Sequence, residues 1–412
     1  MRAFPESTIF PEHWKTDFLG KKIKLNYGKS QSAVQTPDGK FPIYGTGGLM
    51  GMASDWLSKS DSVLLGRKGT LDNPLYISEP FWAVDTTFYV SDFEGSYKWL
   101  YYLFKFIDLS RWNEATGVPS LSRNNIEFIE IAFPPNKEQS KIAEVLATID
   151  RAIAQTEALI AKHQRIKTGL MQDLLTRGID EHGQLRDPST HRFKSTPLGV
   201  MPEEWEVAPL KNKITIKHGY SFLGEFFSDV DNGNLLLTPG NFHIEGGLYF
   251  DPEKTKYYTG KFPKEFILKN GDVLVVMTDL TKEMAILGNT VILDHPQNVL
   301  HNQRIGLIEQ ISKEKINSKY LTLLMNSNFC KSVVKMTATG TTVRHTSPTK
   351  ILSAILPFAK HDEQERVVAV IGNSESQIAH LKDSVVKLGS LKQGLMQDLL
   401  SGRVSVSVLM EG

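Results

Sequence analysis

Three short segments of the chain carry residue types that bind nucleic acid. The first is Gly66-Arg67-Lys68-Gly69-Thr70, which follows an apolar run and offers two cations and a hydroxyl on a glycine-containing turn. Such a group suits a phosphate or a guanine edge, because an arginine can donate two hydrogen bonds to O6 and N7. A solvated turn without a ligand is an equally good interpretation of this segment taken alone.

The other two segments lie in the second half of the chain. Asn302-Gln303-Arg304 offers amides and a guanidinium suited to base edges, and residues 338–347 are dense in hydrogen-bond donors. The latter segment begins with Ala-Thr-Gly, as do residues 115–123, and each copy precedes a long predicted helix. This repetition indicates a shared role. The candidate DNA-binding residues are Gly47, Arg67, Lys68, Thr70, Arg123, Asn302, Gln303, Arg304, Thr341, Thr342, Arg344 and His345.

Motifs for catalysis are missing from the sequence. The segment Gly45–Gly51 resembles a dinucleotide-binding loop, but its third glycine comes one place late and no amphipathic helix follows, which favours a glycine turn. There is no phosphate-binding Walker loop, no His-Glu-x-x-His and no paired metal carboxylate motif. We therefore expect no catalytic residue, no metal site and no cofactor on this chain.

A long internal repeat organises the rest of the chain. Gly-Leu-Met-Gln-Asp-Leu-Leu occurs at 169–175 and again 225 residues later, at 394–400. Near the domain starts, residues 11–30 resemble residues 202–221, including Trp14 and Trp205, at an offset of 191. This period is too long for a solenoid repeat. The two copies are similar in sequence at both ends and dissimilar in between. This pattern predicts two domains that have the same function but act on different targets.

Each copy of the repeat ends a long amphipathic helix, at about 137–175 and 361–400. The apolar stripe of either helix is wider than a strict zipper seam. Two such helices most simply bury their stripes on each other as an antiparallel intramolecular coiled coil with internal pseudo-twofold symmetry, although each could instead pack on its own domain. Gly372-Asn373 is a position where the second helix could kink. The expected pairing and docking residues are Ile142, Leu146, Ile149, Ile153, Ile160, Leu170, Leu174, Ile371, Ile378, Val385, Leu395 and Leu399.

The domain interiors carry strand signals. Short apolar runs such as 62–65 and 273–276 stand between turn clusters, and a helical stretch lies near the end of each interior, at 97–109 and 316–325. We expect two mixed α+β domains with mostly antiparallel sheets. The predicted divisions are domain 1 (1–135), helix 1 (136–176), a polar linker (177–201), domain 2 (202–359), helix 2 (360–402) and a tail (403–412).

Composition limits the class of protein. With 412 residues and 41% hydrophobic content, the chain can build two or three cores. Its net charge of +1 argues mildly against a nucleic-acid binder, although a local basic face could be hidden in the average. One cysteine, Cys330, excludes a disulfide framework and is expected to be a small buried hydrophobe. Without a signal-peptide core or an apolar run of membrane-spanning length, a cytoplasmic protein is expected.

Several of these motifs together resemble the specificity subunits of type I restriction-modification systems. The similarity includes Glu138-Gln139-x-x-Ile142-Ala143, the closing Gly-Leu-Met-Gln-Asp-Leu-Leu, and the linker from Arg177 to Trp205. In the first domain, residues 44–48, 65–69 and 80–86 look like one common type of target-recognition domain. The second domain lacks the first domain's Gly-Thr-Gly-Gly and Gly-Arg-Lys-Gly sequences, so its target should differ and the full target should be asymmetric.

The resemblance implies a protein with no catalysis of its own. Each domain would recognise one half of a bipartite sequence in double-stranded DNA. The paired helices, each about 55–60 Å long at 1.5 Å per residue, would set the spacing and dock two modification subunits. Restriction subunits would join them, and S-adenosylmethionine, ATP and Mg²⁺ would be bound only by partners. The alternatives are a duplicated, non-enzymatic scaffold that binds other proteins through its long helices, and an enzyme whose site has no familiar motif.

Overall fold

The fold is described from a computed structural model, which covers residues 3–5, 8–281, 283–312 and 315–409. The chain divides into two compact units, and each unit takes residues from both halves of the sequence. Unit 1 consists of Met1–Ile160 with His380–Gly412, and unit 2 consists of Ala161–Ala379. Each unit therefore holds one α+β domain together with parts of both long helices.

The domain of unit 1 is built around a four-stranded antiparallel sheet. Its central strand β5 (Ser62–Gly66) is buried at all five residues, because the sheet is covered on both faces. Helix α1 (Tyr97–Phe106) packs against this sheet and buries Trp99, Leu100 and Leu103. The sheet order is β2 (Ile23–Tyr27), β8 (Thr87–Phe93), β5 and β6 (Leu75–Ile77).

Smaller elements complete this domain. A second sheet has the order β4 (Gly48–Ala53), β3 (Phe41–Gly45) and β7 (Trp82–Ala83), in which β3 and β7 are parallel. Strand β1 (Lys15–Phe18) pairs antiparallel with β9 (Glu130–Phe133) and so joins the two ends of the domain. The remaining helical elements are η1 (Leu19–Lys21), η2 (Leu109–Trp112) and α2 (Arg123–Glu127).

The domain of unit 2 repeats this frame. Its four-stranded antiparallel sheet has the order β13 (Ile214–His218), β22 (Ile305–Gln310), β18 (Val273–Val276) and β20 (Thr290–Ile292), which is the order of the first sheet with equivalent strands. Strand β12 (Glu206–Pro209) pairs with β24 (Ile355–Phe358) as β1 pairs with β9. The covering helices are α4 (Ser318–Asn326), α5 (Asn328–Thr337) and α6 (Pro348–Leu352).

Outside this frame, the second domain has a larger second sheet and several further short elements. A five-stranded sheet has the order β14 (Phe227–Ser228), β16 (Lys256–Tyr258), β15 (Asn234–Leu236), β21 (Asn298–Leu300) and β17 (Ile267–Leu268). Two-stranded sheets are formed by β10 (Phe193–Thr196) with β11 (Gly199–Pro202), and by β19 (Thr278–Asp279) with β23 (Arg344–His345). Short 3-10 turns lie at η3 (Leu210–Asn212), η4 (Gly224–Phe226), η5 (Pro239–Asn241) and η6 (Lys264–Phe266).

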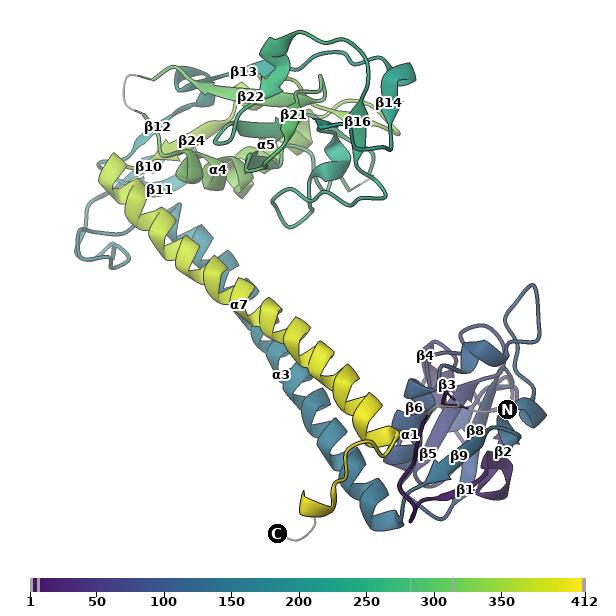
Figure 1. The fold of residues 1–412 in the computed structure, drawn as a ribbon. Helices are drawn as coiled ribbons and strands as arrows, with labels where there is room; N and C mark the ends of the chain where they lie inside the picture. The colour runs from purple at the N-terminus through teal and green to yellow at the C-terminus, as the bar shows by residue number, and fades with distance from the viewer. Residues whose placement is uncertain (1–2, 6–7, 282, 313–314, 410–412) are drawn as a thin grey trace. The chain divides into compact units, whose positions relative to one another are not determined.

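The two long helices are α3 (Asn136–Leu174) and α7 (His361–Leu400), which lie side by side in Figure 1. In unit 1, the first turns of α3 pack on the last turns of α7, as Ile142 and Leu146 share a core with Leu399. In unit 2, the last turns of α3 pack on the first turns of α7, as Leu174 shares a core with Ile371. The helices are therefore antiparallel, which confirms the predicted fold class.

Pairing buries the expected stripe only in part. Ile142, Leu146, Leu174, Ile371, Ile378 and Leu399 are buried. Ile149, Ile153, Ile160, Leu170, Val385 and Leu395 are half-buried. Helix α7 runs through Gly372-Asn373 without interruption, so the predicted weak point does not break it. No helix of the described residues is long and apolar enough to cross a membrane.

Candidate nucleic-acid interface

The first candidate segment lies at a point where three stretches of the unit 1 domain meet. We call this point, formed by residues 66–70, 85–87 and 119–121, junction 1. Arg67 and Lys68 both donate their backbone N–H to Thr86 O, at 2.9 and 3.1 Å, and Leu121 N–H donates to Arg67 O at 2.9 Å. Lys68 also forms an antiparallel bridge with Ser120. The loop before α2 is thereby fixed beside the end of β5.

Two glycines make the tight turn of junction 1 possible. A Cβ atom on Gly66 would lie 1.9 Å from Thr70 O, so any side chain there would collide with the backbone. Gly69 has a φ of +90°, a conformation that L residues rarely adopt. The position of a Gly69 Cβ is 3.7 Å from Thr46 Oγ1, which places the hairpin turn with Gly47 next to the junction.

An equivalent meeting point exists in the unit 2 domain, formed by residues 276–279, 303–305 and 344–346, and we call it junction 2. Met277 N–H donates to Arg304 O at 2.9 Å, and Thr346 N–H donates to Met277 O at 3.0 Å. In the pairing of β19 with β23, Thr278 stands opposite His345. The second and third candidate segments are therefore brought together, on either side of Met277–Asp279.

The backbone contacts give the correspondence between the junctions residue by residue. Met277 makes both backbone bonds that Arg67 makes, so Thr278 occupies the place of Lys68. His345 occupies the place of Ser120. Two residues further on, Ser122 caps α2 and Ser347 caps α6 through the same side-chain bond to a backbone N–H. This agreement on both sides fixes the register, although the loop before His345 is two residues longer.

The candidate side chains of unit 1 differ in what they already contact. Arg67 donates from Nη1 to Asp85 O at 3.0 Å, and its guanidinium lies 5.2 Å from the centre of the Tyr27 ring. Arg123 is held in an ion pair with Glu127, at 2.6 Å between Nε and Oε1. By contrast Lys68, Thr70 and Gly47 are exposed. Lys68 is the cation of junction 1 that remains available to a ligand.

The candidate side chains of unit 2 also divide into those bonded within the domain and those that are exposed. Asn302 is buried and its Oδ1 accepts the backbone N–H of Arg304 at 3.0 Å, whereas Gln303 and Arg304 are exposed. Arg344 donates from Nη1 to Gly340 O at 2.6 Å and so braces the loop that carries the exposed Thr341 and Thr342. His345 is exposed, and its Nδ1 lies 3.2 Å from Thr278 Oγ1.

Sequence reasoning missed two residues of junction 2. Thr278 and Asp279 are nearly inaccessible, and Asp279 accepts the backbone N–H groups of Thr281, Ile286 and Leu287 at 2.7–3.0 Å. Asp279 thereby organises the loop that follows the strand. A signal was present: both Lys68 and Thr278 follow an apolar run, but the two runs share no residue motif that would align them.

The sequence of the chain is similar to a known protein family and to several named proteins. Residues 11–163 match the family model described as Type I restriction modification DNA specificity domain. A relative from Methanocaldococcus jannaschii, the type I restriction enzyme MjaVIII specificity subunit, is 24% identical over 97% of this chain and 95% of its own length. The type I restriction enzyme EcoDI specificity subunit of Escherichia coli is 24% identical over 50% of this chain and 51% of its own length. The chain is therefore similar to type I specificity subunits over nearly its whole length, and its first domain matches the type I specificity domain.

Solved structures agree at the level of the fold. The S subunit of a type I restriction-modification system from M. genitalium superposes with a TM-score of 0.57 at 13% identity, over 96% of this chain and 98% of that one. A chain from a structure on complex assembly and conformational transition of the type I R-M system gives a TM-score of 0.60 at 15% identity, over 96% and 100%. The type I specificity fold thus extends over nearly the whole sequence.

The repeated Glu-Gln pair shows how each long helix is fixed to its domain. In unit 1, Gln139 accepts the backbone N–H of Ser96, the cap of α1, at 3.0 Å and donates to Pro134 O at 2.9 Å. In unit 2, Gln364 accepts the N–H of Asn317, the cap of α4, at 2.9 Å and donates to Ala359 O at 2.8 Å. Each long helix therefore begins in a fixed position relative to the sheet and helix of its own domain.

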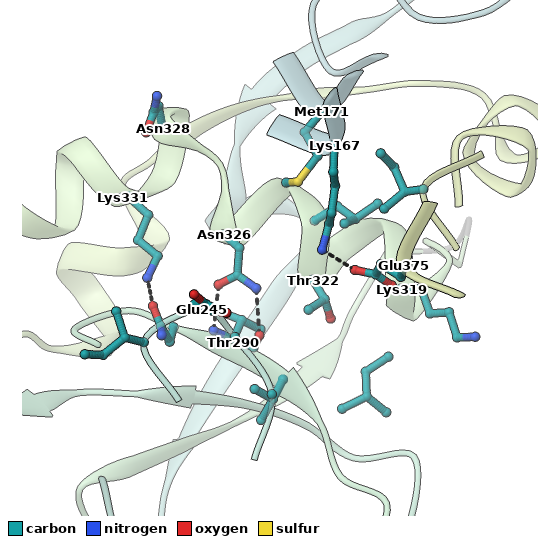
Figure 2. Close-up of a pocket in the computed structure, with 18 of the residues that line it drawn as sticks. Lys167, Met171, Glu245, Thr290, Lys319, Thr322, Asn326, Asn328, Lys331 and Glu375 are labelled. Atoms are coloured by element: carbon teal, nitrogen blue, oxygen red, sulfur yellow. Dashed lines mark hydrogen bonds and ion pairs between the residues drawn. The ribbon is translucent and has the colours of Figure 1, made fainter. Parts of the chain in front are cut away.

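Unit 2 also contains a cavity of about 760 Å³, between its domain and its parts of the two long helices (Figure 2). Its polar side chains bond mainly with one another. Lys167 Nζ pairs with Glu375 Oε1 at 2.5 Å, Asn326 exchanges two hydrogen bonds with the backbone of Thr290, and Lys331 donates to Asn289 Oδ1. Burial lowers the pKa of Lys331 to about 8. These bonds tie α3 to α7, and α5 to the sheet.

Among the described residues, no group of three His, Cys, Asp or Glu side chains is placed to hold a metal ion. Several groups of the two domains have pKa values shifted mainly by burial. Burial raises the pKa of the Cys330 thiol to about 12, and burial with a hydrogen bond to Asp61 raises that of Tyr76 to about 12. Burial lowers the pKa of His301, whose Nε2 contacts Ile305 O at 2.9 Å. These groups belong to packing and hydrogen bonding inside the domains.

Proposed function

We propose that this specificity subunit recognises a bipartite, asymmetric sequence in double-stranded DNA, with one domain for each half-site. The observation that carries the proposal is the pair of junctions. Their backbone hydrogen bonds are equivalent, yet the side chains that they present differ, since Lys68 is replaced by Thr278 and Ser120 by His345. A repeated frame with unlike polar groups suits two related surfaces that recognise unlike base sequences.

The helices supply the second part of the proposal, which is docking of two modification subunits. Most large apolar side chains of α3 and α7 are buried or half-buried. Leu159 and Val386 are 45% and 69% exposed but do not occupy matching positions of the repeat, whereas the other two exposed residues, Ile166 and Leu391, are 44% and 50% exposed. These two residues occupy the same position of the repeated sequence, six before Gln172 and Gln397. Two equivalent exposed apolar residues suit two identical partner subunits, whereas the DNA half-sites differ.

In this proposal the chain itself does no chemistry. Its partners would be the modification subunits, which would bind S-adenosylmethionine and transfer the methyl group, and restriction subunits, which would use ATP and Mg²⁺. The contribution of this chain would be affinity for the right DNA and the placement of its partners on it. The modest net charge of +1 is compatible with that role if the partners supply part of the positive surface around the duplex.

Footprinting of the chain assembled with its modification subunits tests the proposal. We expect two protected patches separated by a gap in which base changes have no effect on binding. A single continuous recognition sequence would contradict the bipartite arrangement. Binding of partner proteins without any sequence preference for DNA would favour the scaffold alternative, and methyl transfer by the isolated chain would contradict the non-catalytic role.

A further inference from the structure

The two junctions differ in one pair of facing residues, and this difference has a chemical consequence. In junction 1 the strand residue is Lys68 and the facing loop residue is Ser120. In junction 2 the strand residue is Thr278 and the facing loop residue is His345. The long, titratable side chain has therefore moved from the strand to the loop, and the hydroxyl from the loop to the strand.

Lys68 is suited to reach a ligand. Its backbone N–H is fixed by Thr86 O at 3.1 Å, while its side chain is exposed. Among the residues that the structure describes, its ammonium contacts no carboxylate and no aromatic ring. The neighbouring Arg67 already donates to Asp85 O and lies over Tyr27. Of these two adjacent cations, Lys68 is thus the one whose charge is not already used within the domain.

His345 is the exposed member of the pair in junction 2. Thr278 is only 4% exposed, so it cannot itself contact a large ligand such as a duplex. Its Oγ1 lies 3.2 Å from His345 Nδ1 and therefore holds the ring in one orientation, while the donor or acceptor role of that nitrogen depends on the tautomer. The other ring nitrogen, Nε2, has no hydrogen-bond partner within the described part of the chain. Among the described residues, the imidazole is therefore bonded through Nδ1, and its Nε2 remains available to a ligand.

We infer that Lys68 in junction 1 and His345 in junction 2 are specificity-determining residues, although they stand on opposite sides of the equivalent residue pair, and that Thr278 is a positioning residue for His345. The inference rests on the proposed function, because it assigns these side chains to DNA bases. A lysine ammonium only donates, which favours the O6 and N7 acceptors of guanine. An imidazole oriented by Thr278 presents Nε2 to a ligand as a donor or an acceptor, depending on the tautomer. The two half-sites should therefore differ at the base that faces this position.

Selection from a pool of duplexes with randomised sequence, using the full-length chain assembled with its modification subunits, tests the inference. We expect Lys68→Ala to reduce the enrichment of the preferred base at one position of the first half-site by about 5-fold or more, with the second half-site unchanged. His345→Ala should do the same at one position of the second half-site. Thr278→Val should reproduce the His345→Ala pattern, whereas Thr278→Ser, which keeps the hydroxyl, should retain the preference.

The linker offers a matched control for the threonine–histidine pair. Thr190 Oγ1 lies 2.9 Å from His191 Nδ1 at an exposed position, so Thr190→Val and His191→Ala remove the same contact outside the junction. These variants should leave both half-sites unchanged. Thermal unfolding of each variant checks that folding is retained, and Lys68→Ala tests the first domain independently of any effect in the second.

The outcomes separate the inference from the proposed function. If the wild-type assembly selects a bipartite sequence and Lys68→Ala, His345→Ala and Thr278→Val leave every base preference unchanged, the inference is overturned and the proposed function stands. A uniform loss of binding to all sequences would also overturn it, since that pattern indicates phosphate contacts. If the wild-type assembly selects no sequence, both fail together.

Discussion

The indole Nε1–H of Trp205 donates a hydrogen bond of 3.0 Å to Glu363 Oε2, and both side chains are buried. The same bond joins Trp14 to Glu138 in unit 1, also at 3.0 Å. In each unit, a tryptophan from the start of the domain is thereby bonded to the first turn of the following long helix. The second copy is more deeply buried, because Arg186 of the linker also pairs with Glu363.

Removal of this carboxylate should destabilise unit 2 strongly. Glu363 is bonded to Arg186, to Trp205 and to the backbone N–H of Ile179. Glu363→Ala would leave the buried guanidinium of Arg186 with an ion pair to Glu204 at 3.0 Å and a long hydrogen bond to Arg177 O at 3.5 Å. We expect a loss of about 3 kcal/mol in the free energy of unfolding. Urea titration followed by hydrogen exchange would assign the loss to unit 2.

A nearby glutamate provides the control for that measurement. Glu365 is exposed and lies 3.5 Å from His361 on the same helix turn. Glu365→Ala should change the free energy of unfolding by less than about 0.5 kcal/mol. Equal losses in the two variants would show that the buried ion pair does not contribute as described.

Arg304 and Arg344 should behave differently when replaced, although both are candidate DNA contacts. Arg304 is exposed, and its side chain has no internal partner among the described residues. Arg304→Ala should weaken DNA binding by about 1–3 kcal/mol without lowering the melting temperature. Arg344 braces its loop through Gly340 O, so Arg344→Ala should lower both DNA affinity and the protection of 338–346 from hydrogen exchange.

Paired measurements of affinity and melting temperature check this contrast. Lys217, an exposed residue paired with Glu309 on the sheet, serves as the control cation, and Lys217→Ala should leave both quantities nearly unchanged. If Arg304→Ala bound DNA as the wild type does, Arg304 would be only a solvated side chain.

The long helices should contain two functionally different sets of apolar residues. Leu146 is fully buried in the core of unit 1, so Leu146→Ala should cost about 2–5 kcal/mol of stability. Ile166 and Leu391 are about half exposed, and aspartate at either position should cost little stability. Each of these two substitutions should instead remove one of two bound modification subunits.

Co-purification with the modification subunit, followed by mass measurement of the assembly, counts the bound copies. Exposed Gln172, in the repeated sequence itself, offers a polar control through Gln172→Ala. Retention of both copies by the Ile166→Asp, Leu391→Asp double variant would show that docking uses another surface.

The single thiol should react only when unit 2 opens. Cys330 is 1% exposed on α5, and burial raises the pKa of its thiol to about 12. Because the pKa of the thiol in the folded chain is higher than its ordinary value of about 9, this group stabilises the fold below about pH 9, and its contribution is lost as the pH rises toward 12. At pH 8 an aromatic disulfide reagent should label native protein at least about 100-fold more slowly than protein in urea. Rapid labelling of the native chain would contradict this burial.

The overall architecture could be predicted from the sequence because its main motifs occur twice. The repeated heptapeptide, the Glu-Gln pairs and the two tryptophans predicted the duplicated α+β unit and the antiparallel helices, and the fold confirms both. Periodicity also located the strands around 62–65 and 273–276. These features depend on local patterns of apolar residues, which are visible without knowledge of the tertiary contacts.

Only the tertiary structure decided which polar side chains remain available at each junction. Arg67, Lys68, Arg304 and Arg344 look alike as cations in loops, but internal acceptors hold Arg67 and Arg344 in place. The equivalence of Lys68 with Thr278 is likewise invisible in the sequence, because it rests on backbone hydrogen bonds between strands far apart in the chain. Hydrogen bonding across such distances depends on the packed sheet, so the sequence alone determines the frame, and the fold determines which groups can meet DNA.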